Sequence, residues 1–280
     1  MGSPTGPVRN RRHYLMCRPT YFAVDYAINP WMDPAAEVDR ERAIRQWEAL
    51  RDLYLELGHR VSEITPVEGL PDMVFAANGA LVVDGRVYGA RFASAERTPE
   101  GPAYLDWFRK AGVSEGFVET SEPKYVNEGE GDFITLDDLI LAGTGFRTDA
   151  AAHQEAERFL GRPVVTLQLV DPRFYHLDTA LCALSGTQIA YYPGAFSAGS
   201  RKVLRALYPD ALTATEEDAA VLGLNAVCDG SNAILPAEAT GLAARLRALG
   251  LTVHHVEIDE LRKAGGGAKC CTLELRGAPD

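Results

Sequence analysis

Residues 80–89 read ALVVDGRVYG, and residues 104–118 read YLDWFRKAGVSEGFV. The first stretch consists of two short apolar strands around an Asp84-Gly85 turn, which predicts a β-hairpin. The second places apolar residues at helical spacing up to Gly112, a common helix end, and continues into the β-like run Val113 to Val118. Together they predict one unit with the order strand, strand, helix, strand.

The same order recurs along the chain, with further hairpin turns at Asp137-Asp138, Ser185-Gly186 and Asp229-Gly230. The other predicted helices, each with the β run that follows it, are Asp33-Pro34 to Gly58 with Arg60 to Ile64; Asp149 to Leu160 with Val164 to Leu169; Arg201 to Leu207 with Ala211 to Ala214; and Ala239 to Leu249 with Thr252 to Ile258.

Five units at intervals of roughly 50 residues predict a closed array of supersecondary units. Because each unit carries a helix, we expect an α/β fold, a five-bladed αβ-propeller made of ββαβ modules with pseudo-five-fold symmetry. An unrelated α/β domain with alternating elements is the alternative. The last half-hairpin, Cys270 to Leu275, finds a partner only if the strand His13 to Cys17 closes onto it. We expect residues 1–12 to form a flexible tail and residues 13–280 one domain.

The composition is that of a globular protein, with 46% hydrophobic and 24% charged residues among 280. The 28 basic and 39 acidic residues give a net charge of −11, which argues against a nucleic-acid partner. The sequence contains no long apolar run, no signal peptide and no Cys-x-x-Cys spacing, so we expect a cytoplasmic protein with reduced thiols, no metal site and no membrane partner.

Polar residues open each predicted hairpin at intervals that follow the repeat. Since equivalent positions in a closed array face one axis, we expect these side chains to converge at one end of it. They are Asp72, Glu128 and Asp132, His176 and Asp178, Asn225, and Cys270.

This set has a chemical logic. Cysteine is an effective nucleophile as the thiolate, and histidine moves protons near neutral pH. Carboxylates that face one another require a cation between them, and a planar guanidinium donates a forked pair of hydrogen bonds to each carboxylate. The combination indicates attack on the central carbon of a guanidine.

Each feature taken alone has a structural interpretation. Cys17, Cys182 and Cys228 lie in apolar runs and are expected to be small buried side chains. Cys270 differs because it follows Gly265-Gly266-Gly267, which permits close approach of the backbone to a ligand. His176 is as compatible with a structural role as with a catalytic one, and it is the joint spacing that favours a site.

The ordered motifs PD-x-VF, E-G-x-G-D, H-L-D-T and GGG-x-x-C, spread over nearly the whole chain, resemble those of the guanidino-group-modifying (amidinotransferase) superfamily. Within it the sequence is similar to the dimethylarginine dimethylaminohydrolases, with features shared with arginine deiminases. The resemblance implies a five-unit αβ-propeller and a covalent cysteine intermediate. It implies catalytic roles for Cys270, His176 and Glu128, and substrate-binding roles for Asp72, Asn78, Arg97, Asp132, Arg147 and Asp178.

Three departures from the family pattern bear on the pocket. The acidic motif is one residue longer here, Glu128-Gly-Glu-Gly-Asp132, so Glu130 could replace Glu128. Asn78 stands where many relatives have an aspartate. Asp178 is present where dimethylargininases often lack it, which suggests the exchange of one carboxylate for another.

The sequence therefore predicts a hydrolase that converts an N-omega-methylated arginine to citrulline and an alkylamine. An arginine deiminase or an amidinotransferase on the same fold is the alternative, and an inactive arginine-metabolite-binding protein is an alternative of another class. The expected partner is a small guanidino substrate, without a cofactor, and a homodimer is left open.

Overall fold

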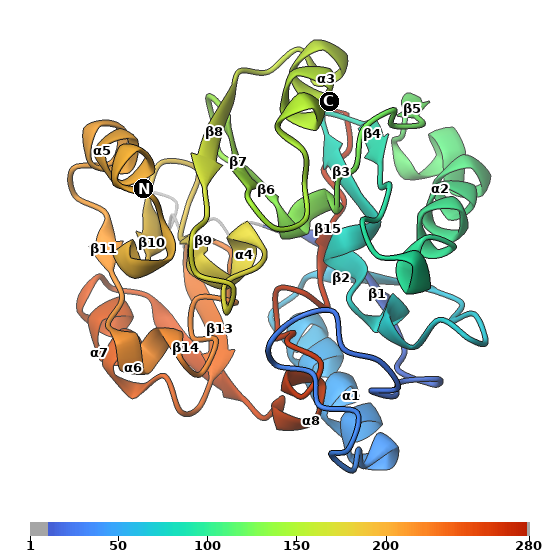
Figure 1. Cartoon of the computed structure of the whole chain (residues 1–280), viewed down its shortest axis with the longest axis horizontal. Helices are drawn as coiled ribbons and strands as arrows, with labels where there is room; N and C mark the ends of the chain where they lie inside the picture. The colour runs from blue at the N-terminus through green and yellow to red at the C-terminus, as the bar shows by residue number, and fades with distance from the viewer. Residues whose placement is uncertain (1–10, 279–280) are drawn as a thin grey trace, which may run out of the picture.

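The computed structural model describes residues 11–278, and the side chains of all of these except residues 113 and 114. Five three-stranded sheets are arranged around a common centre, each with its long helix on the outside (Figure 1). Every sheet has two antiparallel strands, joined as a hairpin in four of the five, and a helix leads to a third strand parallel to the second. This is the predicted five-bladed αβ-propeller.

The blades, in chain order, are β3 (Ala80–Val83), β4 (Arg86–Gly89), α2 (Glu100–Ala111) and β5 (Glu119–Ser121); β6 (Phe133–Thr135), β7 (Ile140–Thr144), α3 (Ala150–Leu160) and β8 (Val164–Gln168); β9 (Leu181–Ala183), β10 (Ile189–Tyr191), α5 (Ala198–Leu207) and β11 (Leu212–Thr213); β12 (Val227–Cys228), β13 (Asn232–Pro236), α7 (Thr240–Ala248) and β14 (Thr252–Val256); and β15 (Leu273–Glu274), β1 (His13–Cys17), α1 (Arg40–Glu56) and β2 (Arg60–Ile64). Three short helices, α4 (Leu177–Ala180), α6 (Glu216–Ala219) and α8 (Asp259–Arg262), lie between them.

The fifth blade is assembled from both ends of the described chain. Strand β1 pairs antiparallel with β15, with Tyr14 opposite Glu274 and Leu15 opposite Leu273, and parallel with β2. The predicted partnership between the N-terminal strand and the last half-hairpin is thereby confirmed. The predicted tail, residues 1–12, lies almost wholly outside the described residues.

Two predicted boundaries were wrong. Helix α1 begins at Arg40 because Asp39 caps it, accepting a hydrogen bond from the Arg42 amide at 2.9 Å, whereas Asp33 caps only a local turn. The run predicted as a strand over residues 113–118 is interrupted by Gly116, whose φ of +82° makes a turn. The paired strand, β5, follows that turn instead.

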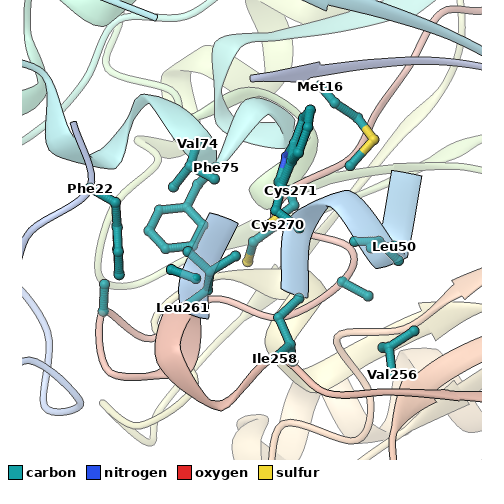
Figure 2. Packing of buried hydrophobic residues seen from close by; sticks show 14 of the residues in the cluster. Met16, Phe22, Leu50, Val74, Phe75, Val256, Ile258, Leu261, Cys270 and Cys271 are labelled. Carbon is teal, nitrogen blue, oxygen red and sulfur yellow. The ribbon is translucent and has the colours of Figure 1, made fainter. Parts of the chain in front are cut away.

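Apolar clusters fill the space between the sheets and their helices. Trp47, Leu50 and Tyr54 project from α1 at helical spacing and are completely buried against the fifth blade. Burial of each such side chain stabilises the fold by about 1.5–3 kcal/mol. Figure 2 shows that Cys270 and Cys271 lie within this cluster. The predicted nucleophile is therefore held in position by the packing of the hydrophobic core.

Among residues 11–278, no helix is both long enough and apolar enough to cross a membrane.

Candidate active site

The predicted site residues gather at the end of the propeller axis where the hairpins begin. Seven of them stand in the segments that lead into the innermost strands of the blades, whereas Arg97 and Arg147 stand between the second strand and the helix of a blade. This placement is why residues distant in sequence meet there. None is more than 8% exposed; the nine are Cys270, His176, Glu128, Asp72, Asn78, Arg97, Asp132, Arg147 and Asp178.

The Cys270 sulfur is held by two neighbours. The Asn225 side-chain amide donates to it at 3.1 Å, and the thiol donates to Asp178 Oδ2 at 3.4 Å. Asn225 Oδ1 also accepts hydrogen bonds from the backbone amides of Gly267 and Cys270, both at 3.0 Å. Burial, and then the nearby Asp178 carboxylate, raise the pKa of the thiol well above its ordinary value. The free protein therefore holds this group as a thiol.

Asn225 was expected to reach this end of the axis from its place in the repeat, but it was not assigned a catalytic or substrate-binding role. It is completely buried and makes contact with both Cys270 and the Asp178 carbonyl. The glycines before Cys270 serve this packing. A Cβ on Gly267 would lie 2.8 Å from Asn225 Oδ1, and one on Gly266 would lie 2.1 Å from the Phe75 ring. Glycine is therefore required at both positions because the backbone there lies close to side chains of the protein itself.

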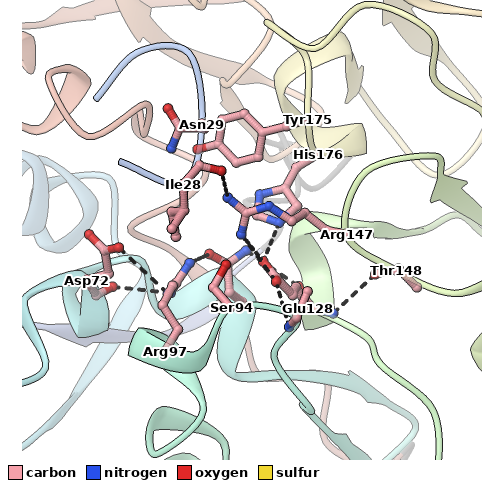
Figure 3. A network of polar contacts seen from close by, with 12 residues as sticks. Ile28, Asn29, Asp72, Ser94, Arg97, Glu128, Arg147, Thr148, Tyr175 and His176 are labelled. Atoms are coloured by element: carbon pink, nitrogen blue, oxygen red, sulfur yellow. Dashed lines mark hydrogen bonds and ion pairs between the residues drawn. The ribbon is translucent and has the colours of Figure 1, made fainter. Parts of the chain in front are cut away.

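A second group is built on Glu128 (Figure 3). His176 Nε2 lies 2.7 Å from Glu128 Oε2, and Arg147 donates to both carboxylate oxygens at 3.2 and 3.0 Å. Burial alone would raise the pKa of Glu128, but the Arg147 guanidinium and the hydrogen bond from His176 hold it far below its ordinary value. Because Glu128 is ionised, His176 Nε2 carries the proton in this bond. Its Nδ1 has no partner among the described residues.

Glu130 has a different set of partners from Glu128. Its carboxylate pairs with Lys269 at 2.7 Å and with Arg276, and accepts from the Glu274 backbone amide. The divergence from Glu128 arises at Gly129, whose φ is +52° and whose Cβ, if present, would lie 2.5 Å from the Ala80 carbonyl oxygen. Of the two acidic residues left open by the sequence, it is Glu128 that contacts His176.

A third group joins Asp72, Asn78 and Arg97. Arg97 donates to Asn78 Oδ1 at 2.9 Å, lies 4.0 Å from Asp72 Oδ2, and forms a two-point ion pair with Glu100 at 2.9 and 2.7 Å. Burial raises the pKa of Asp72, although Arg97 and the Tyr26 hydroxyl oppose this. Glu100 was not predicted, and it occupies much of the Arg97 guanidinium.

Two further buried carboxyl groups have raised pKa values. Burial raises the pKa of Asp132 to about 6, with the nearby His176 opposing, and one oxygen accepts from the Leu177 backbone amide at 3.0 Å. Burial raises the pKa of Asp178 to about 7, although Lys269 and the hydrogen bonds from Cys270 and Asn225 oppose it. Buried carboxyls of this kind are suited to receive a cation, which would favour their charged forms.

A loop over residues 20–32, here called the front loop, contacts the site and was not predicted to do so. The Tyr26 hydroxyl donates to Asp72 Oδ2, and the Ile28 carbonyl accepts from Arg147 Nη2, both at 2.9 Å. Trp31 Nε1 donates to the Arg173 carbonyl at 2.8 Å. Arg147 therefore has its donors engaged by Glu128 and the front loop, and its predicted role toward a substrate carboxylate stays a prediction.

No group of three or more His, Cys, Asp or Glu side chains within the described part of the chain is arranged to hold a metal ion.

Asp178→Asn is expected to raise the free energy of unfolding at pH 8 by about 3 kcal/mol. The folded-state pKa of Asp178 lies above the ordinary value, so the unfolded chain ionises first and stability is lost as pH rises from about 4 to about 7. An asparagine does not titrate and escapes this loss. Urea unfolding of both proteins at several pH values tests this, and a difference that does not change between pH 4 and 8 contradicts it.

A buried thiol, an ionised carboxylate–histidine pair and further buried carboxyls at one end of a five-bladed αβ-propeller define a guanidino-group-modifying enzyme. Comparison with known proteins gives the same class. Residues 15–277 match the family model described as N,N dimethylarginine dimethylhydrolase, eukaryotic. The chain belongs to the dimethylarginine dimethylaminohydrolase family.

The relatives of the chain include a dimethylarginine dimethylaminohydrolase and a bifunctional arginine dihydrolase/ornithine cyclodeaminase. It is 50% identical over 275 residues to the N(G),N(G)-dimethylarginine dimethylaminohydrolase of Mycobacterium tuberculosis, covering 98% of this chain and 89% of that one. It is 38% identical to the bifunctional arginine dihydrolase/ornithine cyclodeaminase ArgZ of Synechocystis, covering 93% of this chain and 37% of the relative.

Solved structures give the same picture. The N-terminal domain of ArgZ, described as an arginine dihydrolase and bound to product, superposes with a TM-score of 0.90 at 36% identity, covering 95% of this chain and 98% of that one. A dimethylarginine dimethylaminohydrolase adduct with 4-chloro-2-hydroxymethylpyridine superposes with a TM-score of 0.77 at 21% identity, covering 94% and 99%, and this match supports the fold alone.

Proposed function

We propose that the chain hydrolyses the guanidino group of an N-omega-methylated arginine to give citrulline and an alkylamine. The observation that carries the proposal is the Cys270 thiol, which is held by Asn225 and Asp178 at the same end of the axis as the ionised Glu128–His176 pair. The 50% identity to a dimethylarginine dimethylaminohydrolase over 98% of the chain supports the choice of substrate.

In the first step the Cys270 sulfur, as thiolate, forms a bond to the central guanidine carbon. The bond from that carbon to the substituted nitrogen breaks, and the amine leaves with a proton that His176 supplies. The bound guanidinium favours the thiolate because an opposite charge lowers the pKa that burial has raised. Asp178 and Glu128 stabilise the positive charge of the guanidinium and of the covalent intermediate.

In the second step water adds to the carbon of the covalent intermediate, and His176 takes a proton from it. The carbon–sulfur bond then breaks and leaves the ureido group of citrulline. Nδ1 of His176 is the nitrogen assigned to both transfers, because Nε2 donates to the Glu128 carboxylate. Glu128 thus fixes the orientation of the imidazole ring.

Arginine itself is a second candidate substrate. The arginine dihydrolase domain superposes with a TM-score of 0.90 at 36% identity, and Asn78 leaves one carboxylate fewer around the guanidine than the aspartate of many relatives would supply. Hydrolysis of an unsubstituted guanidine would release ammonia in place of an alkylamine. An amidinotransferase would instead pass the amidino group to an amine acceptor.

Mass spectrometry of products separates these functions. We expect citrulline and dimethylamine from asymmetric dimethylarginine, at a kcat/KM at least about tenfold above that for arginine. Citrulline or ornithine with ammonia from arginine alone would favour the second candidate, and a guanidinylated acceptor would favour amidino transfer. Tight binding with no product from any of these compounds would indicate the inactive binding protein.

A further inference from the structure

Two adjoining cavities lie between the hairpin turns of the blades and Asp178, the predicted site residue that the inner cavity reaches. The inner cavity has a volume of about 50 Å³ and the outer one about 390 Å³. Thr135, Ala183 and Cys228 are among the residues that line both. The outer cavity is bordered by the hairpin turns at Asp84, Asp137 and Ser185–Gly186, whereas the site residues precede these hairpins.

Three buried polar atoms without a hydrogen-bond partner in residues 11–278 belong to residues that line these cavities. Asp178 Oδ1 belongs to a residue lining the inner cavity, Thr135 Oγ1 to a residue lining both cavities, and Arg12 Nε to a residue lining the outer one. All three atoms are buried and lack hydrogen bonds among the described residues. Buried polar atoms are ordinarily satisfied, and a space of about 50 Å³ that polar groups partly line is large enough for water. The three atoms therefore indicate a water-filled route.

Asp178 joins this route to the nucleophile. Its Oδ2 accepts the Cys270 S–H hydrogen bond at 3.4 Å, while the same side chain forms part of the inner cavity wall. The charged groups that face Asp178 are Lys269 and Glu130, which pair with each other at 2.7 Å. Lys269 is held in addition by the Thr272 carbonyl at 2.8 Å. Asp178 is thus the carboxyl group in direct contact with the thiol.

The front loop covers the site on the side away from these cavities. The front loop is tied to the site by Tyr26, Ile28, Asn29 and Trp31, and Cys270 is 2% exposed. A guanidinium that binds beneath this loop favours the charged forms of both Asp178 and Cys270. The proton lost by the Cys270 thiol must then leave the site on a side that the front loop does not cover.

We propose that the proton lost by the Cys270 thiol is taken by Asp178 and leaves through the two rear cavities. The inference rests on the proposed function, because the guanidinium supplies the driving force. The S–H bond breaks, the ionised Asp178 carboxylate gains the proton, and a cavity water then accepts it and passes it to solvent. Asp178, again ionised, holds the cation beside the thiolate. Its raised pKa, about 7, suits a group that gives up a proton near neutral pH.

The test is to fill the junction of the cavities without touching the site. Thr135→Leu and Ala183→Leu each place bulk where both cavities meet, from two different strands. Ser185→Leu adds the same side chain at the rim of the outer cavity alone and is the matched control. Stopped-flow mixing with asymmetric dimethylarginine in weak buffer containing a pH indicator measures proton release, while tryptophan fluorescence measures binding.

We expect the two junction variants to release protons at least about tenfold more slowly after binding, with kcat lowered, a larger solvent isotope effect and KM little changed. Ser185→Leu should match the wild type. Proton release at the wild-type rate in both junction variants, when they are folded, would overturn the proposal. Citrulline is measured in the same samples, and its absence from the wild type contradicts the proposed function. Normal citrulline production by junction variants that release protons at the wild-type rate contradicts only the proton route through the two cavities.

Discussion

Cys270→Ser is expected to lower kcat by at least about 10³-fold while leaving the dissociation constant for substrate within about threefold. The sulfur is the only nucleophile in contact with Asp178 and Asn225 within the described chain, and a serine hydroxyl is far harder to ionise there. Oxygen for sulfur is a small change in volume, so the buried carboxyls keep their places. Product formation gives kcat, and isothermal titration of the inactive variant gives the dissociation constant.

The adjacent cysteine supplies the control. Cys271 is completely buried in the apolar cluster around α1, and Figure 2 shows it beside Cys270. Cys271→Ala is expected to lower the free energy of unfolding by about 1 kcal/mol and to retain kcat/KM. If Cys270→Ser retained turnover and Cys271→Ala lost it in a folded protein, the assignment of the nucleophile would be wrong.

Glu128→Gln is expected to lower kcat/KM by about 10²–10⁴-fold. Glutamine keeps the shape of the side chain, but it removes the charge that Arg147 and His176 both contact. His176 then lacks the carboxylate that fixes its ring, and the site loses a negative charge that the guanidinium requires. Steady-state kinetics with asymmetric dimethylarginine measures the effect, and circular dichroism establishes that the variant is folded.

Glu130→Gln is the chemically matched comparison two residues away. Glu130 is buried, and its half-buried partners Lys269 and Arg276 would lose their shared carboxylate, so the free energy of unfolding should fall by about 3 kcal/mol. Its effect on kcat/KM should be at least about tenfold smaller than that of Glu128→Gln. The reverse order of kinetic effects in folded proteins would assign the catalytic role to Glu130.

The blades were predictable because their signals are local. The hairpin β3–β4 matches residues 80–83 and 86–89 of the prediction, since an Asp84-Gly85 turn between apolar runs has few alternatives. Helix α3 likewise ends at Gly161, in the left-handed conformation that its position requires. The spacing of polar residues then predicted their convergence, because repeated units place equivalent positions at one axis.

The details that failed depend on packing and side-chain contacts in the folded chain. Asp33 and Asp39 both resemble helix caps, and only packing of Trp47 and its neighbours against the fifth blade selects the later start. The sequence favoured Glu128 but kept Glu130 as an alternative, because the turn at Gly129 that separates them is set by the Ala80 carbonyl of another segment. Likewise, no local pattern near Arg97 reveals that Glu100 and Asn78 occupy its donors.

The pairing of β1 with β15 also bears on when the protein can first act. Almost the whole chain separates these two strands, and Cys270 lies just before β15. During synthesis, at about 5–20 residues per second, β1 emerges early and has no partner on one side until β15 leaves the ribosome. Cys270 and β15 follow the other four blades in the order of synthesis. Under the proposed function, a nascent chain carries His176 and the buried carboxyls before Cys270 is seated, so we expect chains that stop before β15 to be inactive.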